Sequence, residues 1–224
     1  MSPADTAGFR HFHEQLDQLK QRLLDMSVEA LLQRDAGKAD AVIDGDSELD
    51  SLEVEVEGLA VSLLALQQPM ARDLRFIISA IKISSDLERV GDHAVNIAQS
   101  TQRLVAMRSD ITPDPEVEDM ARRARHMLGD ALDAFIRGDG VLGRDVVKRD
   151  DQVDALHDSL FRILLTHMLE DQTNISAALE LFLVSRNLER VADLATNIAE
   201  DAVYLAEGKT IKHRLEDRPV AATA

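Results

Sequence analysis

A twelve-residue segment occurs twice in this chain, and no other feature of the sequence constrains the fold as strongly. The first copy, LERVGDHAVNIA, spans residues 87–98, and the second, LERVADLATNIA, spans residues 188–199. Nine of the twelve positions are identical without a gap, and the copies start 101 positions apart in a chain of 224 residues. A match of this density indicates an internal duplication, so we expect the two halves to fold alike.

Apolar residues around both copies recur at intervals of three and four, which is typical of amphipathic helices. Gly37 is expected to cap the first helix, and Pro69 to lie in the first turn of the third. The pattern predicts three helices in each half, at residues 9–32, 39–66, 70–107, 116–136, 142–169 and 174–207.

The predicted helices are joined by short connections, so consecutive helices are expected to pack antiparallel. The sequence therefore predicts an all-α fold of two tandem three-helix up-and-down bundles related by internal duplication. Their expected boundaries are residues 8–108 and 114–208, followed by a disordered tail at residues 209–224.

Composition excludes several classes of function. The chain has no cysteine, which excludes disulfides, thiolate metal sites and a cysteine nucleophile. Its formal net charge is −16, which argues against a nucleic-acid-binding protein and against adhesion to anionic lipid. No apolar run is long enough to span a membrane, and the N-terminus does not have the pattern of a secretory signal. We expect no membrane insertion and a cytoplasmic location.

Four pairs of acidic residues stand four positions apart, one pair on the second and one on the third helix of each half. Residues four apart lie on the same face of a helix. If the two helices of a half are neighbours, four carboxylates converge and repel one another unless a cation or protons neutralise them. The eight residues are Asp46, Asp50, Glu88, Asp92, Asp150, Asp154, Glu189 and Asp193.

Oxygen ligands alone select hard cations such as Mg²⁺, Mn²⁺ or Ca²⁺, and carboxylates also hold iron in helical bundles. The pattern therefore predicts two exchangeable metal sites near the surface. An alternative interpretation is a solvated acidic face without a ligand. His93 and His157 have no histidine at the matching position of the other half and are expected to be ordinary surface residues.

The two copies, in the context DLERVGDHAVNIA and NLERVADLATNIAED and preceded by QQPMARDLRFIISAIKIS, closely resemble the PhoU family of phosphate-specific transport accessory proteins. The resemblance covers about residues 8–208. It implies two three-helix repeats and surface metal clusters formed by the eight acids, with a divalent or trivalent ion (Mg, Mn, Fe or Zn) as the cofactor.

The same resemblance implies a regulator and not an enzyme. It suggests a cytoplasmic adaptor that restrains the high-affinity phosphate ABC transporter and the phosphate-responsive two-component system. The implied partners are the ATPase subunit of the transporter, the PAS region of the sensor histidine kinase and a second copy of the chain. The alternative is a carboxylate-bridged metal enzyme, either a di-iron oxidase or a metallophosphatase, although neither half carries the Glu-x-x-His pair of di-iron bundles.

Overall fold

The structure is a computed structural model that describes residues 21–211, apart from residues 68, 70, 108–110, 112 and 114. Within the helices, the side chains of residues 46–53, 55, 56, 67 and 72 are also outside the description. The expected helix start at residues 9–20 and the expected tail beyond residue 211 therefore lie outside the described residues.

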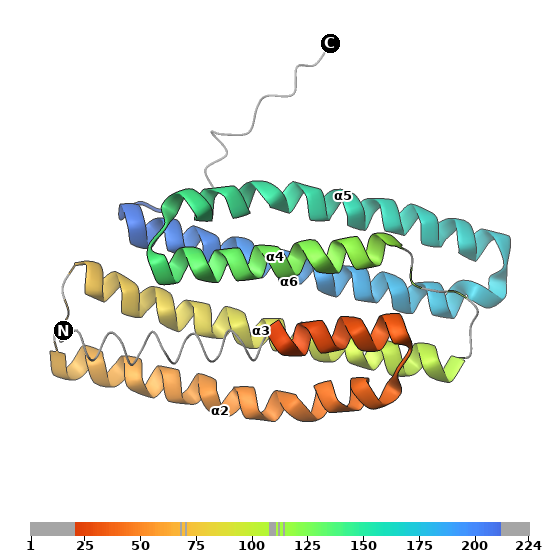
Figure 1. Ribbon diagram of the computed structural model, residues 1–224, viewed down its shortest axis with the longest axis horizontal. Coiled ribbons are helices and arrows are strands. Elements are labelled where there is room, and N and C mark those ends of the chain that lie inside the picture. Colours follow the sequence, from red (N-terminus) through yellow and green to blue (C-terminus); the bar gives the residue numbers. More distant parts are fainter. Residues whose placement is uncertain are drawn as a thin grey trace, which may run out of the picture.

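Every regular element in the described part of the chain is helical, as the periodicity predicts. A first helical segment runs over residues 21–33. It is followed by α2 (Ala36–Gln67), α3 (Arg72–Met107), α4 (Pro115–Arg137), α5 (Gly140–Glu170), the short 3₁₀ turn η1 (Gln172–Asn174) and α6 (Ile175–Glu207). Figure 1 shows these helices side by side along one long axis, which confirms the all-α class.

The predicted C-terminal cap of the first helix and the predicted first turn of the third helix were wrong. Gly37 lies inside α2, and Arg34 instead takes the left-handed conformation that closes the first helix, with φ 51°. Asp35 then caps α2, because its Oδ1 accepts hydrogen bonds from the N–H groups of Gly37 and Lys38 (2.9 and 3.1 Å). Pro69 is not in a first helical turn, since α3 begins at Arg72.

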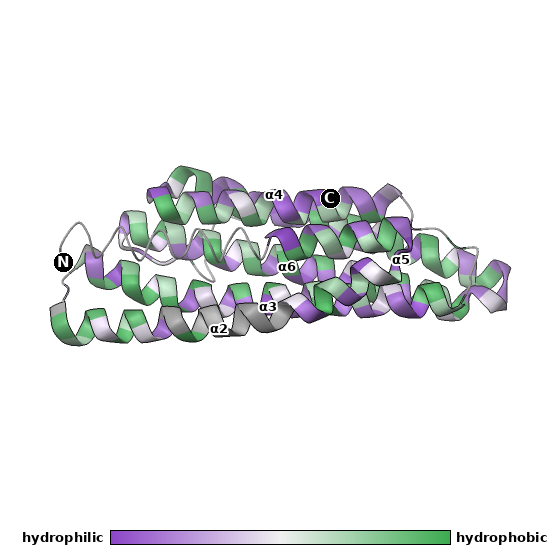
Figure 2. Ribbon diagram, turned by 60° about the horizontal axis from the view of Figure 1, so that its bottom comes forward, coloured by the Kyte–Doolittle hydropathy of each residue, from purple (hydrophilic) through white to green (hydrophobic). Residues whose placement is uncertain are grey.

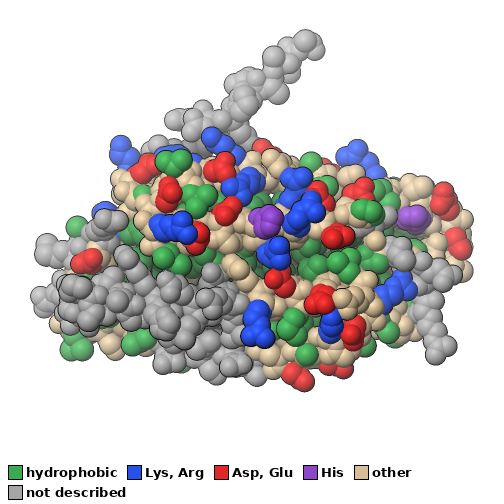
Figure 3. All heavy atoms as spheres, viewed as in Figure 1, with side chains coloured by type: hydrophobic (Ala, Val, Ile, Leu, Met, Phe, Trp, Pro, Cys, Tyr) green, Lys and Arg blue, Asp and Glu red, His purple; other side chains and the backbone are tan. Residues whose placement is uncertain are grey.

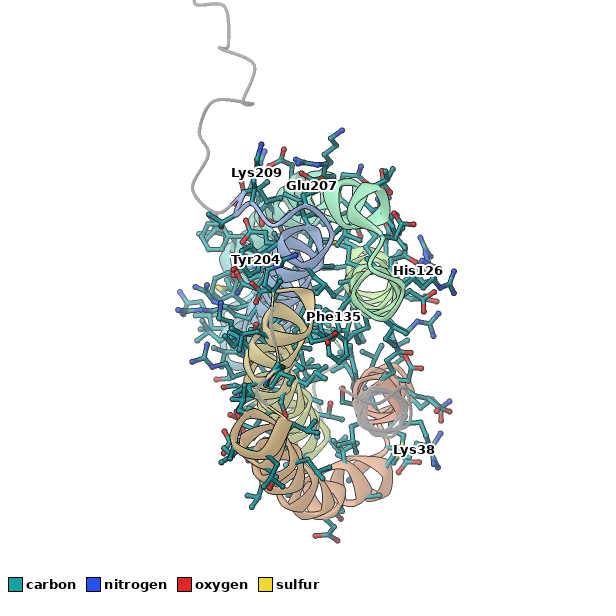
Figure 4. The ribbon with its side chains drawn as sticks, turned by 90° about the vertical axis from the view of Figure 1, so that its left-hand side faces the viewer. Lys38, His126, Phe135, Tyr204, Glu207 and Lys209 are labelled. Atoms are coloured by element: carbon teal, nitrogen blue, oxygen red, sulfur yellow. The ribbon has the colours of Figure 1, made fainter. Side chains whose placement is uncertain are left out.

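Helices α3 and α6, which carry the two motif copies, pack against each other at the centre of the molecule. Helix α2 packs on α3, whereas α4 and α5 pack on α6 and on each other. In the end view of Figure 4, α6 and α3 lie next to each other, with α5 beyond α6 and α2 beyond α3. The duplicated helices therefore form the junction between the two repeats.

The core is built from the apolar stripes that the sequence predicts. Figure 2 shows hydrophobic and hydrophilic residues alternating along the helices. The rings of Phe76 on α3 and Phe135 on α4 stack with centroids 5.2 Å apart, and Phe135 points into the interior in Figure 4. The apolar pattern predicts that Leu59 on α2 contacts the core, but its side chain is 42% exposed. On α3 the apolar pattern predicts one buried face, and the residues on it are buried: Phe76, Ile77, Ala80, Ile83, Leu87, Val90, Ala94 and Ile97.

Candidate functional site

In the second half, the fold brings three of the predicted acids together between α5 and α6. Asp150 and Asp154 lie one turn apart on α5, and Asp193 faces them from α6. Burial raises the pKa of Asp150 to about 6, and the charges of Asp154 and Asp193 add to this increase. Burial and the charge of Asp193 also raise the pKa of Asp154. The three carboxylates thus repel one another in a partly desolvated position.

Asp150 is the least satisfied member of this group. The Thr196 hydroxyl is near enough to oppose the rise in its pKa. Yet Asp150 Oδ1 and Thr196 Oγ1 are both buried, and neither has a partner at hydrogen-bonding geometry within the described part of the chain. A buried carboxylate oxygen without a donor costs free energy, and a ligand that supplies positive charge would recover it.

Asp193 also pairs with a basic residue, and Glu189 is the fourth predicted acid of the second half. Asp193 accepts a hydrogen bond from Arg190 Nη1 on the same helix (2.9 Å), so one basic residue partly neutralises the group. Glu189 is half-buried one turn before Asp193. Over the described residues, no three His, Asp or Glu side chains form a group that is already arranged to hold a metal ion.

In the first half, the structure tests only the acids of α3. Glu88 is half-buried and Asp92 is exposed, so both lie beside the apolar stripe and not within it, as predicted. The side chains of Asp46 and Asp50 lie outside the described residues. Whether all four first-half carboxylates converge therefore stays a prediction.

Asp150, Asp154 and Asp193 suit a hard cation by donor type and by charge. They supply only oxygen atoms, burial and their mutual repulsion raise two pKa values, and one buried oxygen has no hydrogen-bond donor among the described residues. These three residues would hold the ion, and the ion would supply the positive charge that the cluster lacks.

His93 and His157 are not the ordinary surface residues that the sequence predicts. His93 Nδ1 lies 2.9 Å from Asn187 Oδ1, which connects α3 to α6. His157 Nδ1 lies 3.0 Å from the Ser185 hydroxyl, and its ring packs on Phe182 with centroids 5.3 Å apart. Both histidines join helices, and only their neighbours in space, not the sequence, reveal this.

Sequence reasoning also missed a groove between α3 and α6. Arg103 on α3 donates through Nε to Glu180 on α6 (2.7 Å) and through Nη2 to Ser100 (3.0 Å). Arg186 and Arg190 approach from α6 on the same side. These residues come from opposite halves of the chain, so no local pattern in the sequence indicates the groove.

The chain matches the family model of the PhoU domain twice, at residues 14–101 and 117–202. A protein of Zymomonas mobilis named phosphate-specific transport system accessory protein PhoU homolog is 37% identical over 219 residues, covering 98% of this chain and 92% of that protein. A protein of Aquifex aeolicus with the same name is 41% identical over 196 residues, covering 88% of each chain.

Two crystal structures resemble this fold over almost its whole length. PhoU from Pseudomonas aeruginosa superposes with a TM-score of 0.89 at 34% identity, covering 93% of this chain and all of the other. The phosphate transport system regulatory protein PhoU from Streptococcus pneumoniae gives a TM-score of 0.83 at 28% identity, covering 92% of this chain and 96% of the other.

Proposed function

The chain belongs to the PhoU family, and from this premise we propose that it restrains the high-affinity phosphate ABC transporter and the phosphate-responsive two-component system. The observation that carries the proposal is the pair of PhoU repeats, which match known members over nearly the whole chain. At the coarser level, the chain is a regulatory accessory protein of phosphate-specific transport and not an enzyme. The carboxylate-bridged metal enzyme is therefore set aside.

The proposed mechanism is that of an adaptor. It contacts the ATPase subunit of the transporter and the PAS region of the sensor kinase from the cytoplasmic side, as a homodimer. In the described part of the chain, no helix is long and apolar enough to cross a membrane.

A metal ion held by the duplicated acids is the second part of the proposal. The support is the raised pKa of Asp150 and Asp154 and the buried Asp150 oxygen that lacks a donor. A bound divalent or trivalent cation would remove the repulsion among these side chains and hold α5 and α6 together at this point. Asp46, Asp50, Glu88 and Asp92 would form the matching site of the first half.

Binding of the purified chain to the transporter's ATPase subunit tests the adaptor. The measurement is made in Mn²⁺ and again in chelator, with Asp150→Asn/Asp193→Asn and with the control variant Asp133→Asn. Asp133 is a suitable control because it pairs with Arg137 on the surface of α4, away from the acids. We expect binding that requires Mn²⁺ and is lost only in the double variant.

Other outcomes separate the two parts of the proposal. Binding that is unchanged in chelator would retain the adaptor and remove the metal from its mechanism. The regulatory function is tested in cells. Deletion of the gene is expected to derepress a phosphate-starvation reporter in rich phosphate. A reporter that stays repressed, in a strain without a second copy of the family, would contradict the regulatory function.

A further inference from the structure

The groove between α3 and α6 has a volume of about 390 Å³ and a basic lining. It is lined on α3 by His93, Asn96, Ser100 and Arg103, and on α6 by Leu183, Arg186, Asn187 and Arg190. Among these described lining residues, three are arginines and none is acidic. A cationic groove is unexpected in a chain whose formal net charge is −16.

Most hydrogen-bond donors of the three arginines are left unused by the protein. A guanidinium carries five N–H donors. Arg103 uses Nε and Nη2, and Arg190 uses Nη1 toward Asp193. Arg186, which is exposed, has no ion pair or hydrogen bond to the other described residues. Arg186 and Arg190 are one helical turn apart, so their like charges repel each other unless an anion lies between them.

Basic residues on another face of the molecule lie among the acidic residues that pair with them. Figure 3 shows Lys and Arg side chains interspersed with Asp and Glu over α4 and α5. Arg149 pairs there with Asp130 (2.5 Å), and Arg125 pairs with Asp25 (3.3 Å). The cavity beside them is lined by both signs of charge, whereas Glu180 and Asp193, the acids that pair with Arg103 and Arg190, do not line the groove between α3 and α6.

The duplication supplies an internal comparison for the groove. At an offset of 101 positions, Arg103 corresponds to Tyr204, and Ser100 corresponds to Asp201. Asp201 is buried there and faces Lys82 at 3.8 Å. Arg186 corresponds to Ser85, and Asn187 to Asp86. Leu183 corresponds to Lys82, so the position equivalent to the groove loses two arginines and gains two acids and one lysine. The duplicated position is therefore not basic, and the cluster of arginines is found on only one side of the α3–α6 junction among the described residues.

The geometry points to a binding site for a phosphate-class oxyanion in this groove, held by Arg103, Arg186 and Arg190. Guanidinium groups bind such anions with paired, charge-assisted hydrogen bonds. The Asn96 side chain, exposed on the same wall, offers an amide donor. The groove is larger than one phosphate ion, so the same site accepts a phosphoryl group carried on a small molecule. This inference does not depend on the partners proposed above.

Titration of the metal-free full-length protein near neutral pH at low ionic strength tests the site, with calorimetry as the readout. The probes are inorganic phosphate and AMP, which represent the free ion and the phosphomonoester. We expect saturable binding that weakens as salt is added. Arg186→Gln should weaken it about tenfold, because a charge-assisted hydrogen bond is lost.

Arg89→Gln is the matched control, because Arg89 occupies the position of Arg190 in the first motif copy and does not line the groove. It should bind as the unmodified chain does. Tighter binding of phosphate assigns the groove to the free ion, and tighter binding of AMP assigns it to a phosphorylated small molecule. Absence of binding by both probes up to millimolar concentration overturns the inference, as does equal weakening by Arg89→Gln and Arg186→Gln. Circular dichroism confirms that both variants are folded.

Discussion

At the residue scale, the acid group between α5 and α6 is a source of instability in the metal-free fold. The sequence predicts which residues belong to it, since Asp150, Asp154 and Asp193 follow from spacing and duplication alone. The sequence does not predict that burial at Asp150 outweighs its neighbours' charges in raising the pKa. That depends on how closely α6 covers α5, which only the packed structure determines.

The raised pKa of Asp150 predicts a pH dependence of stability. Since the folded-state pKa, about 6, is above the ordinary aspartate value of 3.8, the folded state holds more protons between these values. The free energy of unfolding should therefore fall as pH rises through this window. Asp150→Asn should reduce the fall and unfold at higher urea concentration than the unmodified chain above pH 6. Urea unfolding at several pH values, in chelator, measures this.

Asp133→Asn provides the comparison, because Asp133 is half-exposed and paired with Arg137. It should leave the slope of stability against pH unchanged. The same slope in Asp150→Asn as in the unmodified chain would contradict the assigned burial of this carboxylate.

At the element scale, the helices match the predicted ranges within a few residues, and the differences arise from capping. Periodicity locates a helix, whereas its exact end depends on backbone conformation and on single hydrogen bonds. Arg34, which donates to the Ile111 carbonyl, closes the first helix with a positive φ that its residue type does not favour. This contact joins residues 77 positions apart, so it cannot be predicted from local sequence. Local sequence therefore indicates Gly37, incorrectly, as the residue that caps the first helix.

Helices α5 and α6 approach closely at Gly143. A Cβ atom there would lie 2.9 Å from the Ala199 carbonyl oxygen and 3.0 Å from Val203 Cγ2. Gly143→Ala should therefore lower the free energy of unfolding by about 1–3 kcal/mol, despite the better helix propensity of alanine. Gly58→Ala on α2 is the matched control, because a Cβ atom there would meet none of the described atoms within 4 Å.

In the control, only helix propensity changes, so a stability gain of about 1 kcal/mol is expected. Urea unfolding of both variants measures the difference. A gain in stability for Gly143→Ala would show that α5 and α6 are less closely packed than described.

The start of α5 depends on one side chain. Asp139 Oδ1 accepts hydrogen bonds from the N–H groups of Val141 and Leu142 (3.0 and 3.1 Å), which otherwise lack helical partners. Asp139→Ala should cost about 1 kcal/mol, whereas Asp139→Asn or Asp139→Ser should restore most of the loss. Thermal unfolding followed by circular dichroism compares the three variants. Failure of both polar replacements to restore stability would mean that capping is not the cause.

At the scale of the whole molecule, the duplication predicts two similar halves but not how they meet. The stripes on α3 and α6 indicate which faces are buried, and the positions such as Val90 and Val191 are indeed buried. The apolar faces of α3 and α6 can pack against each other in several registers and angles, and sequence periodicity does not predict which one forms. The contacts of His93 with Asn187 and of Arg103 with Glu180 define the chosen arrangement.

The stacked rings of Phe76 and Phe135 join the halves, so we expect the described helices to unfold as one cooperative unit. Phe135→Ala should lower the free energy of unfolding by about 3–5 kcal/mol in a single transition, since Phe135 is almost completely buried. Phe161→Ala is the control, because Phe161 is 47% exposed and contacts Phe182 on α6 within the same half. It should cost about 1 kcal/mol.

Urea unfolding followed by circular dichroism measures both effects. Two separate transitions in Phe135→Ala, with the half containing α5 keeping its midpoint, would mean that the repeats are energetically independent.

Arg190 belongs to two places at once, because it donates to Asp193 in the acid group and also lines the basic groove. A cation on Asp193 would compete with Arg190 for that carboxylate and release guanidinium donors toward an anion. An anion in the groove would in turn release Asp193 toward a cation. Because such coupling is reciprocal, each ion would raise the affinity for the other by the same factor. The chain would then respond most strongly when a cation and an anion are present together.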